Sequence, residues 1–317
     1  MDVLIFGSII ADITVFANNV KKIKAGKKSY FGLDYGSKID VEKIEINCGG
    51  SAHNIAYGLA KMEKKVGIIG KIGNDVFGDK IFSELKVMNV DVTYVLRDKY
   101  PTGTSIVIIG EDKDRTILIY RGANDFIDSQ QVNKEYINNF KWFVFTSVTG
   151  QKSLSSLFKA VKFAKKQGLK ILANPSIAMI KERKKELKEL IKMSDVVVMN
   201  EEEIKSLTGF DLTKSLKILR SLGPDLIVVT KGSEGVVAFH NNKIYEQKSY
   251  KVRKVDTTGA GDAFTVGLLH SLIRKDSLEY ALKFGCACAA LNIKSYGAVK
   301  NFPTEDDIIK MIGERNV

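Results

Sequence analysis

Short apolar segments that alternate with amphipathic segments constrain the fold of this 317-residue chain more than any other feature. Each apolar segment is rich in β-branched or aromatic residues and is bounded by polar residues or glycine, which is typical of a strand buried on both faces. Amphipathic segments with helical spacing separate them, so the pattern predicts a parallel sheet covered by helices on both faces. The predicted strands are DVLIFG (2–7), VGIIG (66–70), WFVFTS (142–147), LKILAN (169–174), DVVVMN (195–200) and DLIVVT (225–230). The predicted helices are 51–62, 76–88, 153–167, 177–192, 201–207 and 213–222.

Three segments break this rhythm because their polar and apolar residues alternate. They are IDVEKIEIN (39–47), TSIVIIG (104–110) and RTILIYR (115–121), the last two joined by a turn-like EDKDR. Alternation predicts strands with one buried and one wet face, which fit a small antiparallel sheet better than the main parallel one. We therefore expect a single α/β domain over 1–317, with a small antiparallel β lid inserted at about 13–48 and 97–125.

Charge and composition narrow the function classes. The net charge is +12, but the lysines are spread along the chain and interleaved with acids, as in KERKKELKELIK (181–192). This is typical of solvated helix faces, so we expect no nucleic-acid partner. No apolar run approaches the roughly 18–20 residues that span a bilayer, and the N-terminus does not resemble a signal peptide. Three cysteines, Cys48, Cys286 and Cys288, predict free thiols in the cytoplasm.

The segment KVDTTGAGDAFTVGLLHSL (254–272) carries the strongest indication of chemistry. Gly259, Ala260 and Gly261 precede an apolar helical run, and such a turn lets backbone N–H groups converge on an anion at the positive end of the helix. Asp262 follows directly, where a carboxylate would repel a bound phosphate. A general base beside a transferring phosphoryl group would explain this acid. The local pattern equally permits Asp262 to be a helix-start residue favoured by the macrodipole.

Four motifs together resemble one known family. DTTGAGDAF (256–264) resembles the C-terminal signature of the ribokinase-like, or PfkB-type, carbohydrate kinases. CGGSAHNIAYGLAKM (48–62) with GKIGNDVFG (70–78) resembles the N-terminal signature, and NEEE (200–203) and VVTKGSEG (228–235) resemble elements of the nucleotide site. The motifs occur in the family's order over essentially the whole chain. The resemblance implies a three-layer α/β/α ribokinase-like fold with a central, mostly parallel sheet.

The resemblance also implies a role for each matching residue on the phosphate side. Asp262 would take the proton from the acceptor hydroxyl, and Gly259, Ala260 and Gly261 would form the anion hole for the γ-phosphate. Asn200 and Glu203 would organise Mg²⁺, with Glu203 acting through water. Their spacing puts an amide and a carboxylate on one helix face, and oxygen ligands suit Mg²⁺. Without the family context, NEEE is more often a negatively charged helix start.

The resemblance implies ATP as the phosphoryl donor. Neither a Walker-A pattern nor G-x-G-x-x-G is present, which excludes a P-loop or Rossmann nucleotide site. A further segment, LNIKSYGAVKNFPT (291–304), resembles the one that closes over the adenine and supplies carbonyls to a monovalent cation. The resemblance therefore implies a K⁺ site at Asp256, Thr258 and Gly297. The implied nucleotide-binding residues are Thr230, Gly232, Gly235 and Asn292.

On the substrate side, Asp12 in GSIIAD (7–12) matches the family's sugar-binding acid. Gly49 and Gly50 would let the backbone approach the sugar, and Asn54 would hydrogen-bond to it. Arg121 either reaches a polar or anionic group of the substrate or lies on the lid surface. The neighbouring histidine at position 53 is left out of the predicted site, because a lone histidine on a helix more often packs or faces solvent.

One position departs from the relatives that phosphorylate ribose, which commonly carry GGKGAN with a lysine that reaches the sugar. Here that position is Ser51. We expect an ATP-dependent kinase that phosphorylates a hydroxymethyl group of a sugar, working as a homodimer through the lid. The alternatives are a nucleoside kinase of the adenosine, cytidine, inosine or guanosine type and a non-catalytic nucleotide- or sugar-sensing protein. Tyr30, Phe31 and Tyr35 either stack on a substrate or pack within the lid.

Overall fold

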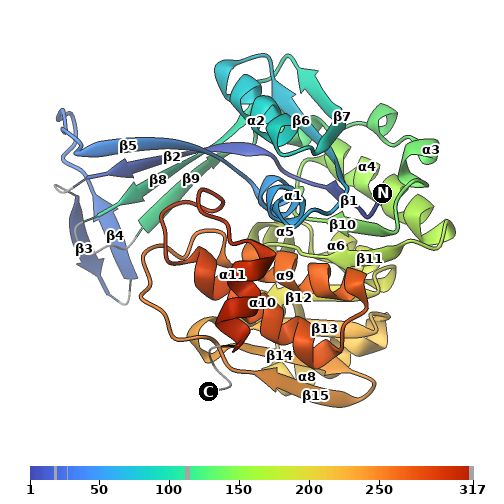
Figure 1. The fold of residues 1–317 in the computed structure, drawn as a ribbon. Coiled ribbons are helices and arrows are strands. Elements are labelled where there is room, and N and C mark those ends of the chain that lie inside the picture. The colour runs from blue at the N-terminus through green and yellow to red at the C-terminus, as the bar shows by residue number, and fades with distance from the viewer. Residues whose placement is uncertain (18–19, 27, 111–114, 314–317) are drawn as a thin grey trace.

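A nine-stranded sheet forms the centre of the molecule (Figure 1). The structure is a computed structural model, and it describes residues 1–17, 20–26, 28–110 and 115–313. All strand pairs are parallel except those of β14 with β13 and β15. In the order of the sheet the strands are β15 (Lys243–Gln247), β14 (Val236–His240), β13 (Leu226–Thr230), β12 (Val196–Asn200), β11 (Lys170–Ala173), β10 (Trp142–Phe145), β1 (Val3–Phe6), β6 (Val66–Gly73) and β7 (Asp91–Asp98).

Helices cover both faces of this sheet, and the cores on the two faces are separate. Along β1, Val3 and Ile5 belong to one core and Leu4 and Phe6 to the other, because successive side chains of a strand point to opposite faces. The first face packs against α1 (Ser51–Lys61), α2 (Val76–Val87), α9 (Ala260–Arg274), α10 (Leu278–Asn292) and α11 (Glu305–Gly313). The second packs against α3 (Lys134–Ile137), α4 (Gln151–Lys166), α5 (Ile177–Glu182), α6 (Lys184–Lys192), α7 (Glu201–Thr208) and α8 (Leu212–Leu222). The predicted three-layer arrangement is confirmed.

The helices differ from the sequence-based expectation in two ways. The predicted helix 177–192 is two helices, because Arg183 leaves the helical region at φ −134° and its Nε donates to Thr149 O at 2.8 Å. Among the residues that the structure describes, three short 3₁₀ helices are also present: η1 (Gly122–Phe126), η2 (Ser129–Gln131) and η3 (Gly232–Glu234). Among the described residues, no helix combines the length and apolar character needed to cross a membrane.

A smaller sheet projects from the body (Figure 1). Its strand order is β5 (Lys43–Gly49), β2 (Ile10–Phe16), β8 (Gly103–Ile109) and β9 (Arg115–Tyr120). The pairs β2–β5 and β8–β9 are antiparallel as expected, but the central pair β2–β8 is parallel. An additional hairpin of β3 (Lys21–Ala25) and β4 (Lys28–Gly32) lies at the outer end of the small sheet. Most of the turn predicted between β8 and β9, at 111–114, lies outside the described residues.

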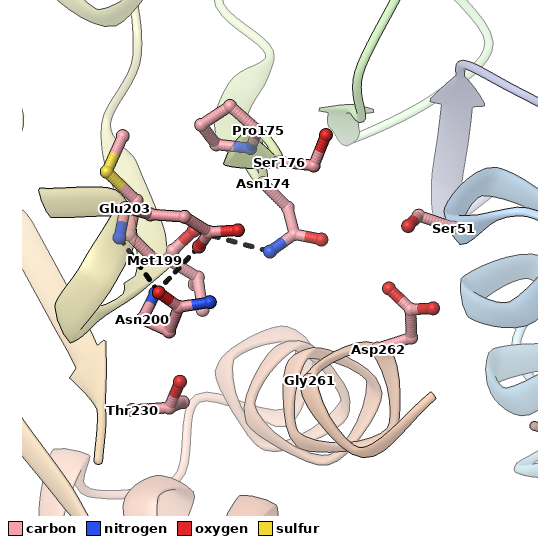
Figure 2. A pocket seen from close by; sticks show the side chains of 11 residues that line it. Ser51, Asn174, Pro175, Ser176, Met199, Asn200, Glu203, Thr230, Gly261 and Asp262 are labelled. Atoms are coloured by element: carbon pink, nitrogen blue, oxygen red, sulfur yellow. Dashed lines mark hydrogen bonds between the residues drawn. The ribbon is translucent and has the colours of Figure 1, made fainter. Parts of the chain in front are cut away.

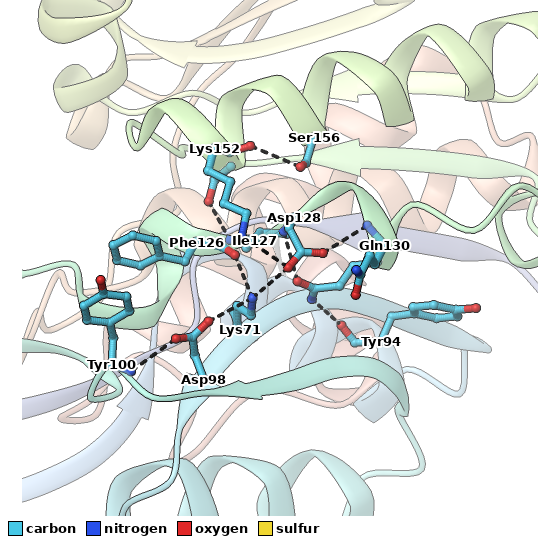
Figure 3. A network of polar contacts seen from close by, with 12 residues as sticks. Lys71, Tyr94, Asp98, Tyr100, Phe126, Ile127, Asp128, Gln130, Lys152 and Ser156 are labelled. Atoms are coloured by element: carbon cyan, nitrogen blue, oxygen red, sulfur yellow. Dashed lines mark hydrogen bonds and ion pairs between the residues drawn. The ribbon is translucent and has the colours of Figure 1, made fainter.

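A buried lysine ties the root of the small sheet to the body (Figure 3). Lys71 of β6 is 5% exposed, and its Nζ lies 2.9 Å from Asp98 and 3.1 Å from Asp128. The same ammonium donates to the carbonyl oxygen of Phe126 at 2.8 Å. Asp98 ends β7 just before the chain enters the small sheet, and Phe126 and Asp128 follow just after it returns. The buried Lys71 ammonium thus joins both ends of this segment. A buried salt bridge of this kind stabilises a structure only when hydrogen bonds compensate for the loss of hydration.

Candidate active site

A cavity of about 110 Å³ lies where the parallel strands of the main sheet end and helix α9 begins (Figure 2). Open α/β sheets bind ligands at the carboxyl ends of their strands, so this is the expected place for a site. Its walls come from the segment after β11, from β12 and β13, from the starts of α1 and α7, and from the first turn of α9. The lining residues are Ser51, Asn174, Pro175, Ser176, Val198, Met199, Asn200, Glu203, Thr230, Gly261 and Asp262.

Asp262 points into this cavity from the first turn of α9 (Figure 2). The amide of Asn54 donates from Nδ2 to Asp262 Oδ2 at 2.8 Å, and Ser51 also hydrogen-bonds to the carboxylate. Burial raises the pKa of Asp262 and the nearby Asp12 raises it further, while the hydrogen bonds from Asn54 and Ser51 lower it only in part. A carboxylate whose pKa is raised toward the working pH is a better proton acceptor for an alcohol than an exposed aspartate is.

The backbone that leads into α9 suits an anion. Gly259 has φ 75°, and a Cβ there would lie 2.6 Å from the Cβ of Ala298, so only glycine fits. A Cβ on Gly261 would meet no atom within 4 Å among the described residues, so this glycine borders open space. Within that described part of the chain, no side chain caps the start of α9. The N–H of Ala260 donates to the carbonyl oxygen of Thr257 at 3.2 Å, so the neighbouring N–H groups of this turn and the positive dipole end of α9 are what a ligand such as a phosphate can use.

Asn200 and Glu203 begin α7 as a reciprocal cap. Asn200 Oδ1 accepts from Glu203 N at 2.8 Å, and Glu203 Oε2 accepts from Asn200 N at 2.8 Å. Burial, with the nearby acids Glu202 and Asp262, raises the pKa of Glu203 to about 7. Negative charges on neighbouring buried acids repel one another, and a bound Mg²⁺ would reduce this repulsion. The side-chain oxygens of Asn200 and Glu203 are the type of ligand that Mg²⁺ prefers. The residues present therefore fit a magnesium site.

Asp12 lies on β2 and faces the glycine turn before α1. Ser105 Oγ donates to Asp12 Oδ1 at 2.5 Å, and burial raises the pKa of Asp12. A Cβ on Gly49 would lie 1.9 Å from Asp12 Oδ2, and one on Gly50, at φ 90°, would lie 2.5 Å from the carbonyl oxygen of Ser8. The two glycines are thus required because the turn packs closely against the Asp12 side chain and the Ser8 backbone.

The three residues predicted for a monovalent cation come together at a second cavity of about 20 Å³ between the small sheet and the body. Asp256 Oδ1 accepts from the backbone N and the Oγ1 of Thr258 at 2.9 and 2.8 Å, and Asp256 Oδ2 accepts from Gly297 N at 3.1 Å. Arg115 of β9 places a guanidinium nitrogen 3.4 Å from the same carboxylate. The site therefore already contains a cationic side chain.

Other predicted residues lie outside both cavities. Arg121 donates to Glu182 Oε1 at 2.6 Å, so its guanidinium is engaged by α5. Gly232 and Gly235 shape the turn between β13 and β14, where a Cβ on Gly235 would lie 2.0 Å from the carbonyl oxygen of Gln247. Asn292 is buried at the end of α10, and neither polar atom of its amide finds a hydrogen-bond partner among the described residues. Such an orphaned amide is consistent with a ligand contact.

The lining residues that were not predicted from sequence include two polar ones, Asn174 and Ser176. Both follow β11, and the Asn174 amide points into the cavity in Figure 2. Its Nδ2 donates to the carbonyl oxygen of Val198 at 3.3 Å. The available signal was positional: polar residues follow the carboxyl end of a buried strand in LKILANPS.

Comparison with known proteins gives a consistent picture. A family model described as pfkB family carbohydrate kinase matches residues 2–305. A deoxyribokinase of Salmonella typhimurium is 26% identical over 313 residues, covering 96% of this chain and 96% of the relative. A 5-dehydro-2-deoxygluconokinase of Bacillus subtilis is 29% identical over 279 residues, covering 83% and 86%. A candidate ribokinase II from E. coli, solved in complex with ATP and Mg²⁺, has a TM-score of 0.86 at 22% identity, covering 99% of both chains.

Proposed function

The chain belongs to the pfkB family of carbohydrate kinases, and from this premise we propose that it transfers the γ-phosphate of ATP to a hydroxymethyl group of a sugar, with Asp262 as general base. As a member of that family it is a phosphotransferase with an alcohol group as acceptor. The observation that carries the finer proposal is the position of Asp262. Its carboxylate lies in the cavity, is held by Asn54, and stands beside the uncapped start of α9.

In the proposed reaction the acceptor hydroxyl approaches Asp262, which accepts its proton as the oxygen attacks the γ-phosphorus. The bond between that phosphorus and the bridging oxygen of ADP breaks, and ADP leaves with the electron pair. The N–H groups of Gly259, Ala260 and Gly261 stabilise the negative charge on the transferring group. Mg²⁺ held by Glu203 and Asn200, through water at Glu203, would neutralise phosphate charge. Thr230, Gly232, Gly235 and Asn292 would hold the nucleotide.

The acceptor binds, in this proposal, between Asp12 and the turn at Gly49 and Gly50, with the small sheet acting as a lid that excludes water. The chain is then a single domain over 1–317 with a lid inserted from about 13–48 and 97–125. Ser51 is too short to reach a sugar as lysine would. This favours a sugar other than free ribose, and deoxy sugars are the first candidates because two similar relatives carry such names. Arg121 can contact the acceptor, as predicted, only if its ion pair with Glu182 breaks.

A nucleoside acceptor is the second candidate, supported by the aromatic residues of the outer hairpin. Tyr30 on β4 and Tyr35 just after it are 50% and 106% exposed, so both are available to a ligand. The deciding experiment measures ADP release from Mg-ATP with pentoses, deoxy sugars, hexoses, keto-deoxy acids and nucleosides. Saturable ADP release with a sugar supports the proposal, and release with nucleosides alone overturns the choice of acceptor. Ligand binding without any ADP release would indicate a sensing protein instead.

K⁺ is included in the proposal beside Asp256, Thr258 and Gly297. Since the Arg115 guanidinium lies 3.4 Å from the same carboxylate, ion and side chain compete for it. We expect K⁺ to raise turnover relative to tetramethylammonium, and to raise it more in Arg115→Met, where the carboxylate is released. Equal turnover in both salts, in both proteins, would remove K⁺ from the proposal.

A homodimer through the small sheet is also proposed. All six residues of the edge strand β9 are exposed, with Ile117, Leu118 and Ile119 46%, 55% and 58% accessible. An exposed apolar edge strand is a template for pairing with a second copy. Sedimentation should show two chains for the native protein and one for Ile119→Lys. The matched control is Val87→Lys, an exposed apolar residue on α2, which should leave the dimer intact. A cytoplasmic location, with no nucleic-acid or membrane partner, remains a prediction.

A further inference from the structure

Three potential metal ligands of different chemistry converge behind the glycine turn. Cys48 ends β5, His53 lies in the first turns of α1, and Glu84 lies on α2. Their ligand atoms are all within 4.8 Å of one another. The His53 side chain is completely buried, Cys48 is 3% exposed, and the Glu84 side chain is 32% exposed. The cluster is therefore closed toward the core and open to solvent only beside the carboxylate.

The two polar neighbours of His53 exceed what a neutral imidazole can satisfy. His53 Nε2 lies 3.1 Å from Glu84 Oε1, yet neither buried atom has a hydrogen-bond partner of acceptable geometry among the described residues. On the other side of the ring, Nδ1 lies 3.4 Å from Asn54 Oδ1. Both neighbours are acceptors, since Asn54 uses its amide nitrogen toward Asp262. A neutral imidazole carries one N–H and satisfies only one of them.

We propose that Cys48, His53 and Glu84 form a binding site for a Zn²⁺-class transition metal ion. Thiolate, imidazole and carboxylate are the ligands that Zn²⁺ uses, and three protein ligands with an open fourth position form a familiar zinc arrangement. A separation of 3.1 Å between nitrogen and oxygen fits two ligands that each lie about 2.0–2.2 Å from one ion. Metal on Nε2 leaves the proton on Nδ1, which then donates to Asn54 Oδ1.

Binding requires the thiol proton to leave. Burial and the nearby Glu84 carboxylate raise the pKa of Cys48 to about 12, so the thiol is protonated and unreactive in the metal-free protein. The metal replaces that proton, which is released to solvent through the open side at Glu84, and a water takes the fourth position. Lys80 lies close enough to lower the pKa of both Cys48 and Glu84, and its charge opposes the ion. Its ammonium is directed to the carbonyl oxygen of Ile46.

The position of this site links it to the acceptor side of the active site. Cys48 and His53 flank Gly49 and Gly50, and His53 adjoins Asn54, whose amide holds Asp262. A bound ion would fix both sides of the glycine turn to α2 and orient the Asn54 amide. The proposed Mg²⁺ site is separate and chemically different, because it offers oxygen ligands from α7 and the cavity.

The test uses the full-length protein after removal of metal with a chelator, titrated with Co²⁺ and then with Zn²⁺ against a chromophoric chelator. We expect one equivalent of Co²⁺ to give a thiolate charge-transfer band that Zn²⁺ abolishes and excess Mg²⁺ does not. Cys48→Ser should lose the band and bind Zn²⁺ at least about 10-fold more weakly, and His53→Asn should weaken binding similarly. Of the three variants, Glu84→Gln should disturb the core least, because the Glu84 side chain is partly exposed.

Matched controls are available within the chain. Cys288 is a buried cysteine outside the cluster, and His270 is a buried histidine whose Nε2 lies 3.3 Å from Glu305 without a third ligand among the described residues. Cys288→Ser and His270→Asn should keep the native affinity. The proposal is overturned if no thiolate band appears at one equivalent. It is equally overturned if Cys48→Ser and Cys288→Ser, both with native circular dichroism, bind Zn²⁺ as the native protein does.

Discussion

The two carboxylates assigned to the reaction, Asp262 and Asp12, stand on different supports. Asp262 lies in the first turn of α9, in which residues 263–271 are all buried and which packs against α10 and α1. Asp12 lies on β2 of the small sheet, where many apolar side chains are exposed and whose root is tied to the body at Lys71. Burial raises the pKa of both groups. The pKa is thus raised in both carboxyl groups, although Asp262 lies on a helix of the core and Asp12 on a projecting sheet.

This difference suggests that the body of the protein and the small sheet have separate functions. Phosphate chemistry depends on placing charges within fractions of an ångström, which strand ends and a buried helix provide. Acceptor choice depends on a surface that opens and closes, and a projecting sheet with few core contacts is the element with the lower local stability. Variants on the body should therefore change the chemical step, whereas variants on the small sheet should change acceptor binding.

The largest effect is expected for Asp262→Asn. The amide keeps the shape and the contact with Asn54 but does not accept a proton, so kcat should fall about 10³-fold or more with little change in stability. Steady-state ADP release and thermal unfolding measure the two quantities. Asp79→Asn is the control, because Asp79 occupies the first turn of α2 but is exposed. Similar small losses in both variants would reduce Asp262 to a helix-start residue.

A smaller loss is expected for Glu203→Gln. The variant removes a charge from the Mg²⁺ site, so the Mg²⁺ concentration for half-maximal activity should rise about 10- to 100-fold. Glutamine keeps a side-chain oxygen for the cap on Asn200 N, so folding should be preserved. A Mg²⁺ titration at saturating ATP and acceptor measures the effect. An unchanged midpoint would separate Glu203 from the metal.

Asp12→Asn tests the carboxylate on the small sheet. Losing one charged hydrogen-bond acceptor should raise the acceptor KM about 10- to 100-fold while the ATP KM stays the same. Initial rates with each substrate varied in turn distinguish the two constants. If instead kcat alone falls, as for Asp262→Asn, the two carboxylates share one role and the proposed division is wrong.

The smallest effect concerns stability and pH. Glu203 has a folded pKa of about 7 against 4.5 for the ordinary group, so the folded state binds the extra proton between these values. Its contribution is fully present below pH 4.5 and is lost as pH rises through about 7. The Tm of the metal-free protein should therefore fall over this interval, and less steeply in Glu203→Gln. Parallel Tm profiles for the two proteins would contradict the assignment.

Much of the fold follows from local patterns. Six apolar segments became β1, β6, β10, β11, β12 and β13 because a strand covered on both faces has to be apolar throughout. The break at Arg183 was not predictable, because the local sequence remains helical and a bond to the distant Thr149 accompanies the break. Strand β2 was not predicted, and its parallel pairing with β8 was missed because alternation predicts a strand but not its neighbour.

The sequence by itself determined the family, the order of the main elements and the presence of an acid beside a glycine turn, because these depend on residue type and spacing. Only the tertiary structure decided which residues meet. It brought Asn54 to Asp262 across 208 positions, turned Arg121 toward Glu182, and gathered Cys48, His53 and Glu84 around one point. Contacts between residues far apart in the chain arise from packing of whole elements, which no local pattern encodes.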